Sequence, residues 1–240
     1  MDMIFWKYLE ELPEQEAAWR EWNCRLASWY RFNTFYTHYL RVEGRRVKLL
    51  NCPTPCEQGY PRQVMENSPA NIVAVCPLDD AVPIQLKFRD ILIYSIRREA
   101  LHQALCVSLR INYSADRRTE HKNIWHLGDY FCTVSKLYYT VYVTYRTAAL
   151  NETISSLCQL CQKPFVLMAP TGRGLDPETQ QLLAGNNSIL FSMVAELILQ
   201  PDGSFKTLRG IKLPEHGYSQ AVHNRILPIE AYKYLVYKDL

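Results

Sequence analysis

The segment from Leu137 to Met168 constrains the fold most, because it alternates strand-like and helix-like patterns. β-branched and aromatic residues dominate Leu137 to Tyr145, a helical pattern runs from Ala148 to Cys161, and the apolar run Phe165 to Met168 follows. Two strands joined by a helix favour a parallel pair that the helix covers. The sequence therefore predicts a βαβ unit within a mixed α/β or α+β fold.

Further signals continue this pattern toward the C-terminus. Asp176 as N-cap and Pro177 at the first helical position mark the start of a helix. A second helix is predicted over Ser188 to Ile198, and the turn Pro201-Asp202-Gly203 predicts a closing hairpin through Phe205 and Leu208. We therefore expect a C-terminal α/β domain, residues 124–240, that contains the βαβ unit and ends in a hairpin.

The N-terminal half is predicted to contain a different series of elements. Tryptophans and a leucine at helical spacing predict an amphipathic helix from Glu14 to about Tyr39. A hairpin turning at Glu43-Gly44 is expected next, then two strands within a segment rich in Cys and Pro, and then two helices between Lys87 and Ile111. The polar stretch Asn112 to Lys122 predicts an exposed linker, so the first domain is expected to span residues 1–115.

Composition limits the class of protein. Hydrophobic residues make up 48% and charged residues 21%, which is typical of compact globular chains. The net charge of +3 falls well short of the balance typical of strongly nucleic-acid-binding domains. No apolar run reaches the roughly 18–20 residues that a membrane-spanning helix needs, and the N-terminus lacks a secretory signal. These features predict a cytoplasmic protein without a membrane partner, in which the eight cysteines are thiols or metal ligands.

Two short cysteine motifs flank the strands Gln63–Met65 and Ile72–Val75. The first is Cys52-Pro-Thr-Pro-Cys56 and the second is Cys76-Pro-Leu-Asp79. Each places two potential ligands on a tight turn at a strand end, and two such turns can supply four tetrahedral zinc ligands. Residues 52–80 resemble a zinc ribbon, which implies one structural zinc ion.

The implied ligands are Cys52, Cys56, Cys76 and Asp79. The motif differs from the zinc-ribbon pattern in its three-residue spacer and in Asp79, which stands where a fourth cysteine is usual. Asp80, Cys24 or His38 are alternative fourth ligands. A ribbon without metal, in which the cysteines are small buried apolar residues, is the competing interpretation.

Basic residues interleaved with tyrosines suggest a second kind of site. Arginine and lysine neutralise phosphates and aromatic rings stack on bases, and zinc ribbons often occur beside nucleic acid in the proteins that carry them. The residues predicted to meet nucleic acid are Arg45, Arg46, Lys48, Arg97, Arg98, Arg117 and Arg118. The competing interpretation is a solvated face of mixed charge.

Enzyme motifs are weak in this sequence. Cys158-Gln-Leu-Cys161 has redox spacing, but at a predicted helix C-terminus, where the thiol pKa rises. The loop Thr171-Gly-Arg-Gly174 has the position of a phosphate cradle but is followed by acidic residues. His121, His126 and Asp129 near Trp125 are candidates for acid/base work.

These observations favour a non-enzymatic interaction or adaptor protein, a subunit of a larger complex, with nucleic acid as a further partner. The alternative is an enzyme whose site lies along the C-terminal sheet and uses Arg173 and the region of His126.

Overall fold

The computed structural model describes residues 3–51, 61–68, 70–77, 82–118, 123–133, 136–161, 163–209 and 211, without the side chains of 3, 13 and 115–118. The chain forms two compact units: one is Leu12–Arg98, and the other combines Met1–Glu11 with Glu99–Leu240. Within the described ranges, seven α-helices and several sheets confirm a mixed α+β fold.

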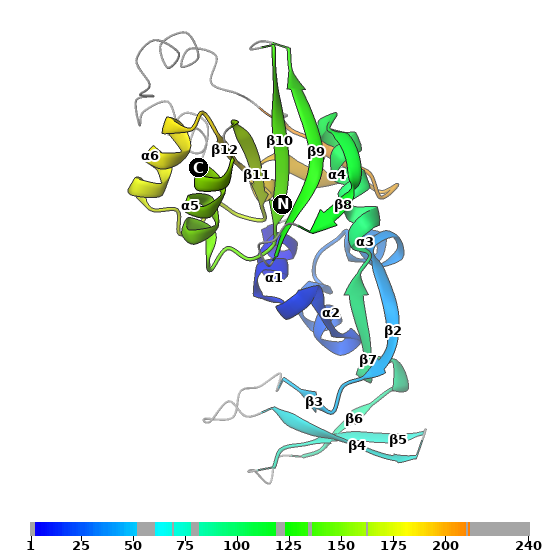
Figure 1. Ribbon diagram of the computed structural model, residues 1–240. Coiled ribbons are helices and arrows are strands. Elements are labelled where there is room, and N and C mark those ends of the chain that lie inside the picture. The colour runs from blue at the N-terminus through cyan, green and yellow to red at the C-terminus, as the bar shows by residue number, and fades with distance from the viewer. Residues whose placement is uncertain are drawn as a thin grey trace. The chain divides into compact units, whose positions relative to one another are not determined.

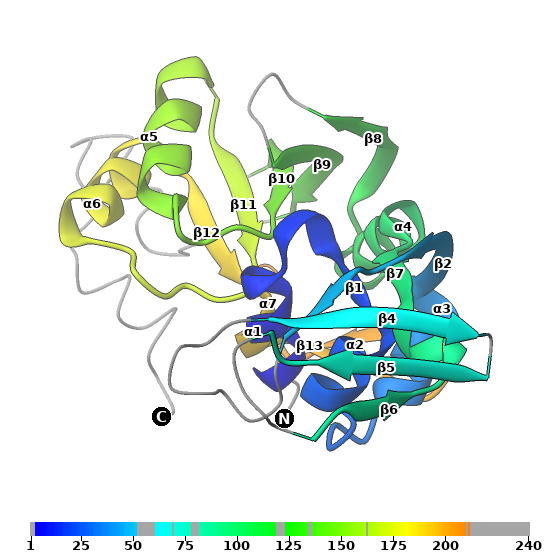
Figure 2. The ribbon, with the colours of Figure 1, turned by 90° about the horizontal axis from the view of Figure 1, so that it is seen from below.

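The unit Leu12–Arg98 contains two antiparallel sheets, ordered β1-β7-β2 and β3-β4-β5-β6 (Figures 1 and 2). The strands are β1 (Glu16–Ala18), β2 (Leu40–Arg46), β3 (Leu49–Leu50), β4 (Arg62–Ser68), β5 (Asn71–Val75), β6 (Ile84–Leu86) and β7 (Leu92–Ile96). The helices are α2 (Trp19–Leu26), α3 (Phe32–Tyr39) and the 3-10 turns η1 (Pro13–Gln15) and η2 (Phe88–Ile91).

The β3–β6 sheet buries only one of its two faces. Leu50, Ile72, Ala74 and Leu86 turn inward and pack with Ala18 and Ile91 in one apolar cluster. Since successive side chains of a strand point to opposite faces, the alternate residues of each strand point away from this cluster. Figure 2 looks onto that outer side of β4, β5 and β6.

The other unit is built on a five-stranded sheet ordered β12-β11-β10-β9-β8. Its strands are β8 (Asn112–Arg118), β9 (Ile124–Cys132), β10 (Leu137–Thr144), β11 (Phe165–Ala169) and β12 (Ile189–Ser192), and β13 (Leu197–Leu199) pairs with β14 (Phe205–Thr207) in a separate hairpin. Its helices are α1 (Met3–Glu11), α4 (Arg98–Leu109, whose first residue belongs to the other unit), α5 (Leu150–Leu160), α6 (Pro177–Gly185) and α7 (Met193–Glu196). Strands β10, β11 and β12 run parallel, so β10-α5-β11 confirms the predicted βαβ unit and β13-β14 the closing hairpin.

Helices cover both faces of this sheet. Ile154 and Leu157 of α5 pack with Phe165 and Leu167 on one face. On the other face, His102 of α4 lies against the rings of Trp125 and Tyr145. All five residues of β11 are consequently buried, as is usual for a parallel strand between helical layers.

Several predicted elements are wrong. The polar stretch predicted as a linker forms β8 over Asn112–Arg118, because an edge strand can be polar without exposing core. The domain boundary predicted between residues 115 and 124 accordingly falls between β8 and β9, which are neighbours in one sheet. The expected helix over 188–198 is instead β12, α7 and β13, since a short apolar run does not distinguish strand from helix.

The N-terminal predictions also need correction. The long helix expected from Glu14 to Tyr39 is divided into η1, β1, α2 and α3, and the first of the two helices expected after Lys87 is replaced by η2 and β7. The expected turn at Gly44 lies inside β2, where the register with β7 shifts between Val42 and Arg46. Gly44 has φ of 71°, a conformation that suits glycine and allows this irregularity without a turn.

Candidate functional sites

The strand register of the β3–β6 sheet bears directly on the predicted metal site. Leu50 pairs with Arg62, and Gln63 pairs with Val75. The chain therefore leaves β3 and leaves β5 on the same side of the sheet. We call this side, where β3 and β5 end and β4 begins, the edge of the sheet. Half-buried Cys76 stands at that edge, immediately after β5, whereas Cys52, Cys56 and Asp79 lie outside the described residues.

A buried arginine at this edge escaped the sequence analysis. Arg62 begins β4 and is only 6% exposed. Its guanidinium donates hydrogen bonds to the carbonyl oxygens of Val82, at 3.1 Å, and Ala74, at 3.5 Å. Arg62 therefore ties the strand that follows the first cysteine motif to the chain that follows the second. A single arginine before a strand gave no sequence signal of burial.

Among the residues whose positions are described, no group of three His, Cys, Asp or Glu side chains is arranged to hold a metal ion. Of the alternative ligands, Cys24 is exposed on α2 and His38 is exposed on α3. Asp80 lies outside the described ranges.

The basic residues predicted on β2 are already matched with carboxylates. Arg45 lies 2.6 Å from Glu16, and Arg46 lies 2.7 Å from Glu66. Arg41 pairs with Glu43, whose pKa is lowered by hydrogen bonds first from the Ser95 hydroxyl and then from Arg41. Lys48 is exposed just after β2. This surface carries mixed charge, which weakens its attraction for phosphates.

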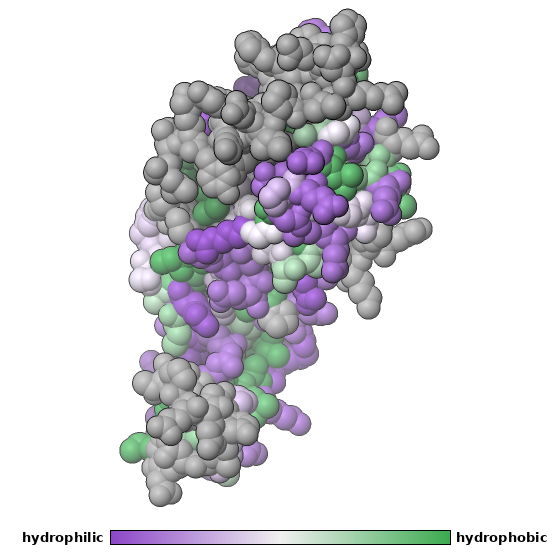
Figure 3. Space-filling model, turned by 90° about the vertical axis from the view of Figure 1, so that its left-hand side faces the viewer, coloured by the Kyte–Doolittle hydropathy of each residue, from purple (hydrophilic) through white to green (hydrophobic). Residues whose placement is uncertain are grey.

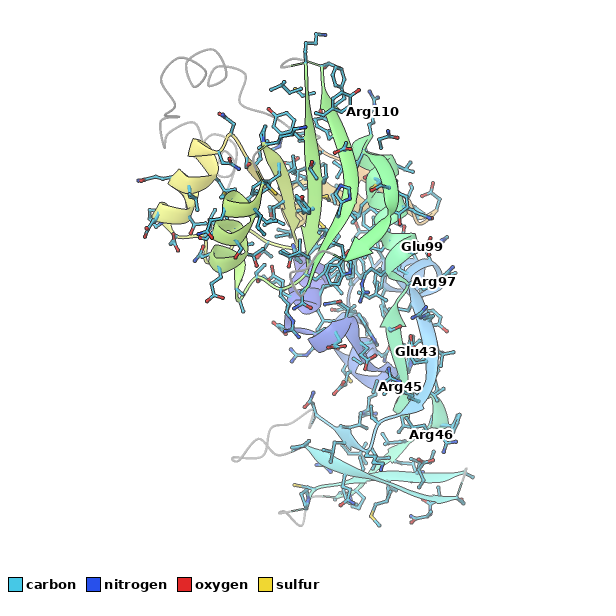
Figure 4. All side chains as sticks on the ribbon, viewed as in Figure 1. Glu43, Arg45, Arg46, Arg97, Glu99 and Arg110 are labelled. Atoms are coloured by element: carbon cyan, nitrogen blue, oxygen red, sulfur yellow. The ribbon has the colours of Figure 1, made fainter. Side chains whose placement is uncertain are left out.

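Arg97 and Arg98 lie at the opposite end of the same sheet. Ile96 pairs with Leu40, whereas Leu92 pairs with Arg46, so Arg97 and Arg46 are separated by the length of β7, roughly 15 Å. Figure 4 shows Arg45 and Arg46 near one end of β2 and Arg97 near the other. Arg97 donates to the carbonyl of His38, and Arg98 to the side chain of Gln15.

Arg117 and Arg118 belong to β8. Their main chains pair with His126 and Trp125 of β9, and their side chains are not among those described. The seven basic residues thus lie on or beside two separate sheets, and at both ends of one of them.

His126, on β9, has neighbours on the two adjacent strands. Its Nδ1 lies 3.2 Å from the Ser114 hydroxyl on β8, and its ring lies 5.7 Å from that of Tyr142 on β10. The Tyr142 hydroxyl lies 3.6 Å from Sγ of Cys161, and burial is the main cause that raises the pKa of Tyr142. Asp129 follows on the same strand, and His121 lies outside the described residues.

A bulge beside His126 shapes this cluster. The β9–β10 register shifts between Val141 and Tyr142, next to Gly128. Gly128 has φ of 146°, and a Cβ there would meet the carbonyl oxygen of Asn112 at 2.0 Å. Only glycine allows β8 to approach β9 this closely, which brings Ser114 and His126 within hydrogen-bond distance.

The C-x-x-C motif lies at the end of α5, as predicted. Burial raises the pKa of Cys158 to about 11, and the neighbouring Cys161 thiol adds to the shift. A thiol with a raised pKa is a poor nucleophile at neutral pH, which favours a packing role for this pair.

The loop considered as a phosphate cradle is occupied by a carboxylate of the same chain. Oε1 of Glu10 accepts hydrogen bonds from the Thr171 main-chain N–H at 2.8 Å and from the Thr171 hydroxyl at 2.7 Å. The Arg173 main-chain N–H donates to the Thr171 hydroxyl, and the Arg173 side chain is exposed. An incoming anion would have to displace Glu10, so the loop is a poor phosphate site.

The outer face of the β3–β6 sheet is a surface that sequence analysis missed. We use this name for the side chains opposite the buried face, namely Leu49, Gln63, Met65, Ser68, Asn71, Val73, Val75 and Gln85. None of them is charged. Leu49 is 55% exposed and Met65 is 45% exposed, while Val73 and Val75 are half-buried.

On the side of the molecule that Figure 3 shows, hydrophobic and hydrophilic residues are interspersed among the described residues.

Within the described part of the chain, no helix combines the length and apolar character needed to cross a membrane.

Comparison of the chain with protein-family models, with curated proteins and with solved structures finds no match.

Proposed function

We propose that this chain is a non-enzymatic interaction protein that binds another protein through the outer face of its β3–β6 sheet. The observation that carries the proposal is the absence of charge among the outer-face residues together with the exposure of Leu49 and Met65. Exposed apolar patches with polar surroundings are typical of protein–protein contacts.

The chemistry of this face favours a protein over a nucleic acid. Nucleic-acid affinity depends on cationic side chains that neutralise phosphates, and the outer face has none. The nearby arginines Arg45 and Arg46 already pair with Glu16 and Glu66. The expected partner presents an uncharged, apolar surface that packs against Leu49, Met65 and the two valines, as sheets pack face to face.

The test introduces a charge on this face. Met65→Glu is compared with Val107→Glu, a matched change at a 79% exposed position of α4 in the other unit. Proteins that copurify with the full chain from its native cells are quantified and purified. Calorimetry then measures their affinity for each variant. We expect a partner whose affinity falls at least tenfold with Met65→Glu and is unchanged with Val107→Glu.

Two outcomes would overturn the proposal. One is a partner whose affinity is the same for both variants. The other is binding to nucleic acid alone, recognised by an affinity that falls steeply with salt.

We also propose that Cys52, Cys56 and Cys76 hold one structural zinc ion, with Asp79 as the fourth ligand. The support is the strand register that sends both connections from one edge of the sheet. Such an ion would stabilise the edge beside the outer face without taking part in a reaction.

Elemental analysis of the purified protein tests the zinc proposal. We expect about one equivalent of zinc and a melting temperature that falls on chelation. Cys76→Ser should abolish binding, whereas Cys24→Ser, at an exposed position on α2, should not. Protein that holds no zinc after purification in zinc-supplemented buffer would rule this site out.

A further inference from the structure

Three aromatic rings of the unit Leu12–Arg98 converge at steep angles. Trp19 begins α2, Tyr36 lies on α3 and Tyr94 lies on β7. The Trp19 ring centroid is 4.8 Å from that of Tyr36 and 5.3 Å from that of Tyr94, and the two tyrosine rings are 5.8 Å apart. Interplanar angles of 52–66° mean that the rings form the walls of a corner and do not stack flat.

The corner holds a cation of the same chain. The Arg89 guanidinium carbon lies 3.7 Å from the centre of the Trp19 ring and 5.0 Å from that of Tyr36. The guanidinium also hydrogen-bonds to the Tyr94 hydroxyl and lowers its pKa, although burial first and then Tyr36 raise that pKa above its usual value overall. Attraction between a cation and the negative face of an aromatic ring accounts for this position.

Arg89 differs from the arginines of β2 in what balances its charge. Arg41, Arg45 and Arg46 each pair with a carboxylate. The acidic residues near the corner are engaged elsewhere: Glu16 binds Arg45, and Asp90 accepts the N–H of Lys87. Among the residues that the structure describes, aromatic faces and one phenol contact the Arg89 guanidinium.

Two of the three rings reach the surface. Trp19 and Tyr36 are half-buried, Tyr94 is buried, and Arg89 is exposed on the 3-10 turn η2. Behind the corner, Phe32 stacks on Trp19 at 5.5 Å, and Trp22 donates a hydrogen bond to the Tyr94 carbonyl. The rings are thus fixed by packing, while the cation that fills the corner comes from a surface turn.

Such a corner favours one class of ligand. Ring faces attract positive charge but accept hydrogen bonds poorly, so they cannot replace the water lost by a free ammonium group. A fully methylated ammonium group has no N–H to desolvate and keeps its charge. We propose that Trp19, Tyr36 and Tyr94 form a binding site for a trimethylated lysine side chain, with Arg89 as an internal competitor that must leave first.

The position of Arg89 predicts how the affinity for an external ligand should change when this side chain is replaced. When a site is filled by its own side chain, the apparent affinity for an external ligand is reduced by the fraction of molecules in which the site is open. Replacing Arg89 should therefore tighten binding without creating any new contact.

The experiment titrates the full chain with acetyl-trimethyllysine methylamide, observed by NMR at the Trp19 indole N–H. Arg89→Gln, which keeps a polar side chain but removes the charge, is expected to bind about tenfold more tightly than the parent chain. Calorimetry measures the variants that lack the reporting indole: Trp19→Ala in the Arg89→Gln background should abolish binding, and Trp19→Phe should retain part of it. The neutral analogue with a tert-butyl group in place of trimethylammonium controls for simple apolar binding.

The results distinguish a ligand-binding role of the three rings from a purely structural role of their contact with Arg89. Equal affinity for the charged and the neutral probe would overturn the assignment, because cation–π attraction would then contribute nothing. So would an Arg89→Gln variant that remains folded by circular dichroism yet shifts no Trp19 signal at millimolar probe. The proposal stands apart from the partner proposed for the outer face, since neither Met65 nor Val73 takes part in it.

Discussion

The two larger sheets of this protein differ in how many of their faces they bury. The β8–β12 sheet lies between α5 and α6 on one face and α4 on the other, and every residue of β11 is buried. The β3–β6 sheet buries one face only and leaves Leu49 and Met65 exposed on the other. The first sheet is complete within its own chain. The second leaves an uncharged, partly apolar face exposed, which is the surface that we propose a partner covers.

The two sheets should differ most in how a substitution at the centre of each affects stability. Phe165 is fully buried on β11, so Phe165→Ala should lower the free energy of unfolding by about 3–5 kcal/mol. Met65→Ala on the outer face should change it by less than about 0.5 kcal/mol in the isolated chain. Urea unfolding followed by fluorescence measures both. Similar losses for the two variants would show that the outer face is packed in the free protein, so that both sheets bury two faces.

A smaller effect is expected at the buried edge of the second sheet. Arg62→Met removes the donor to the Val82 and Ala74 carbonyls and should cost about 1–3 kcal/mol. Hydrogen exchange should show lost protection in β4 and β5 and no change in β11. The control is Arg97→Met, at an exposed position, which should leave both sheets protected. Loss of protection in β11 after Arg62→Met would mean that the two sheets do not unfold independently.

The start of α6 offers a prediction of about 1 kcal/mol. The Asp176 carboxylate accepts the Thr179 N–H at 2.6 Å, so Asp176→Ala should destabilise the unit by about that amount. Glu178→Ala, in the first turn but not at the cap, is the matched control. Thermal melts of both variants measure the difference, and an equal loss for the two would assign the effect to helix-end charge and not to the cap.

The smallest effect concerns pH. The pKa of Cys158, raised to about 11 by burial, lies above the value of a thiol in the unfolded chain. The stability that this thiol contributes is therefore present at neutral pH and is lost as pH rises toward 11, because the unfolded chain releases the proton first. Since the group is only half-buried, we expect less than about 1 kcal/mol between pH 8 and pH 10.

Urea unfolding of Cys158→Ala at the two pH values tests this, and the variant should lose less stability than the parent chain. Iodoacetamide at pH 8 should also modify Cys158 more slowly than exposed Cys24. Equal rates at the two thiols would contradict the raised pKa.

The same comparison explains what the sequence could predict. Local signals were sufficient around β10-α5-β11, where strand and helix patterns alternate, and at Asp176-Pro177, whose side chain and ring act on their immediate neighbours. They failed for β8 because its polarity reflects its edge position, which depends on strands far along the chain. They failed for Ser188 to Ile198 because burial on both sides removes the alternation that identifies a strand.

The candidate sites, too, could be predicted only where their signal lies in neighbouring residues of the sequence. The cysteine motifs could be found from spacing, and the position of Cys76 at a strand end agrees with that expectation. The charge-free outer face and the corner of Trp19, Tyr36 and Tyr94 depend on register and on packing between separate elements, so single-sequence patterns gave neither. The pairing of Arg45 with Glu16 likewise joins residues 29 positions apart.

The hydrogen bonds between Glu10 and Thr171 also bear on the order in which the parts of the chain fold. These residues are 161 positions apart, and the whole unit Leu12–Arg98 is made between them. During synthesis that unit can fold as soon as it leaves the ribosome, while α1 waits for a loop that is translated much later. The residues of α1, although made before that unit, thus reach their final place only after Thr171 has been added, and until then the apolar side chains of Phe5, Trp6 and Leu9 cannot complete their burial.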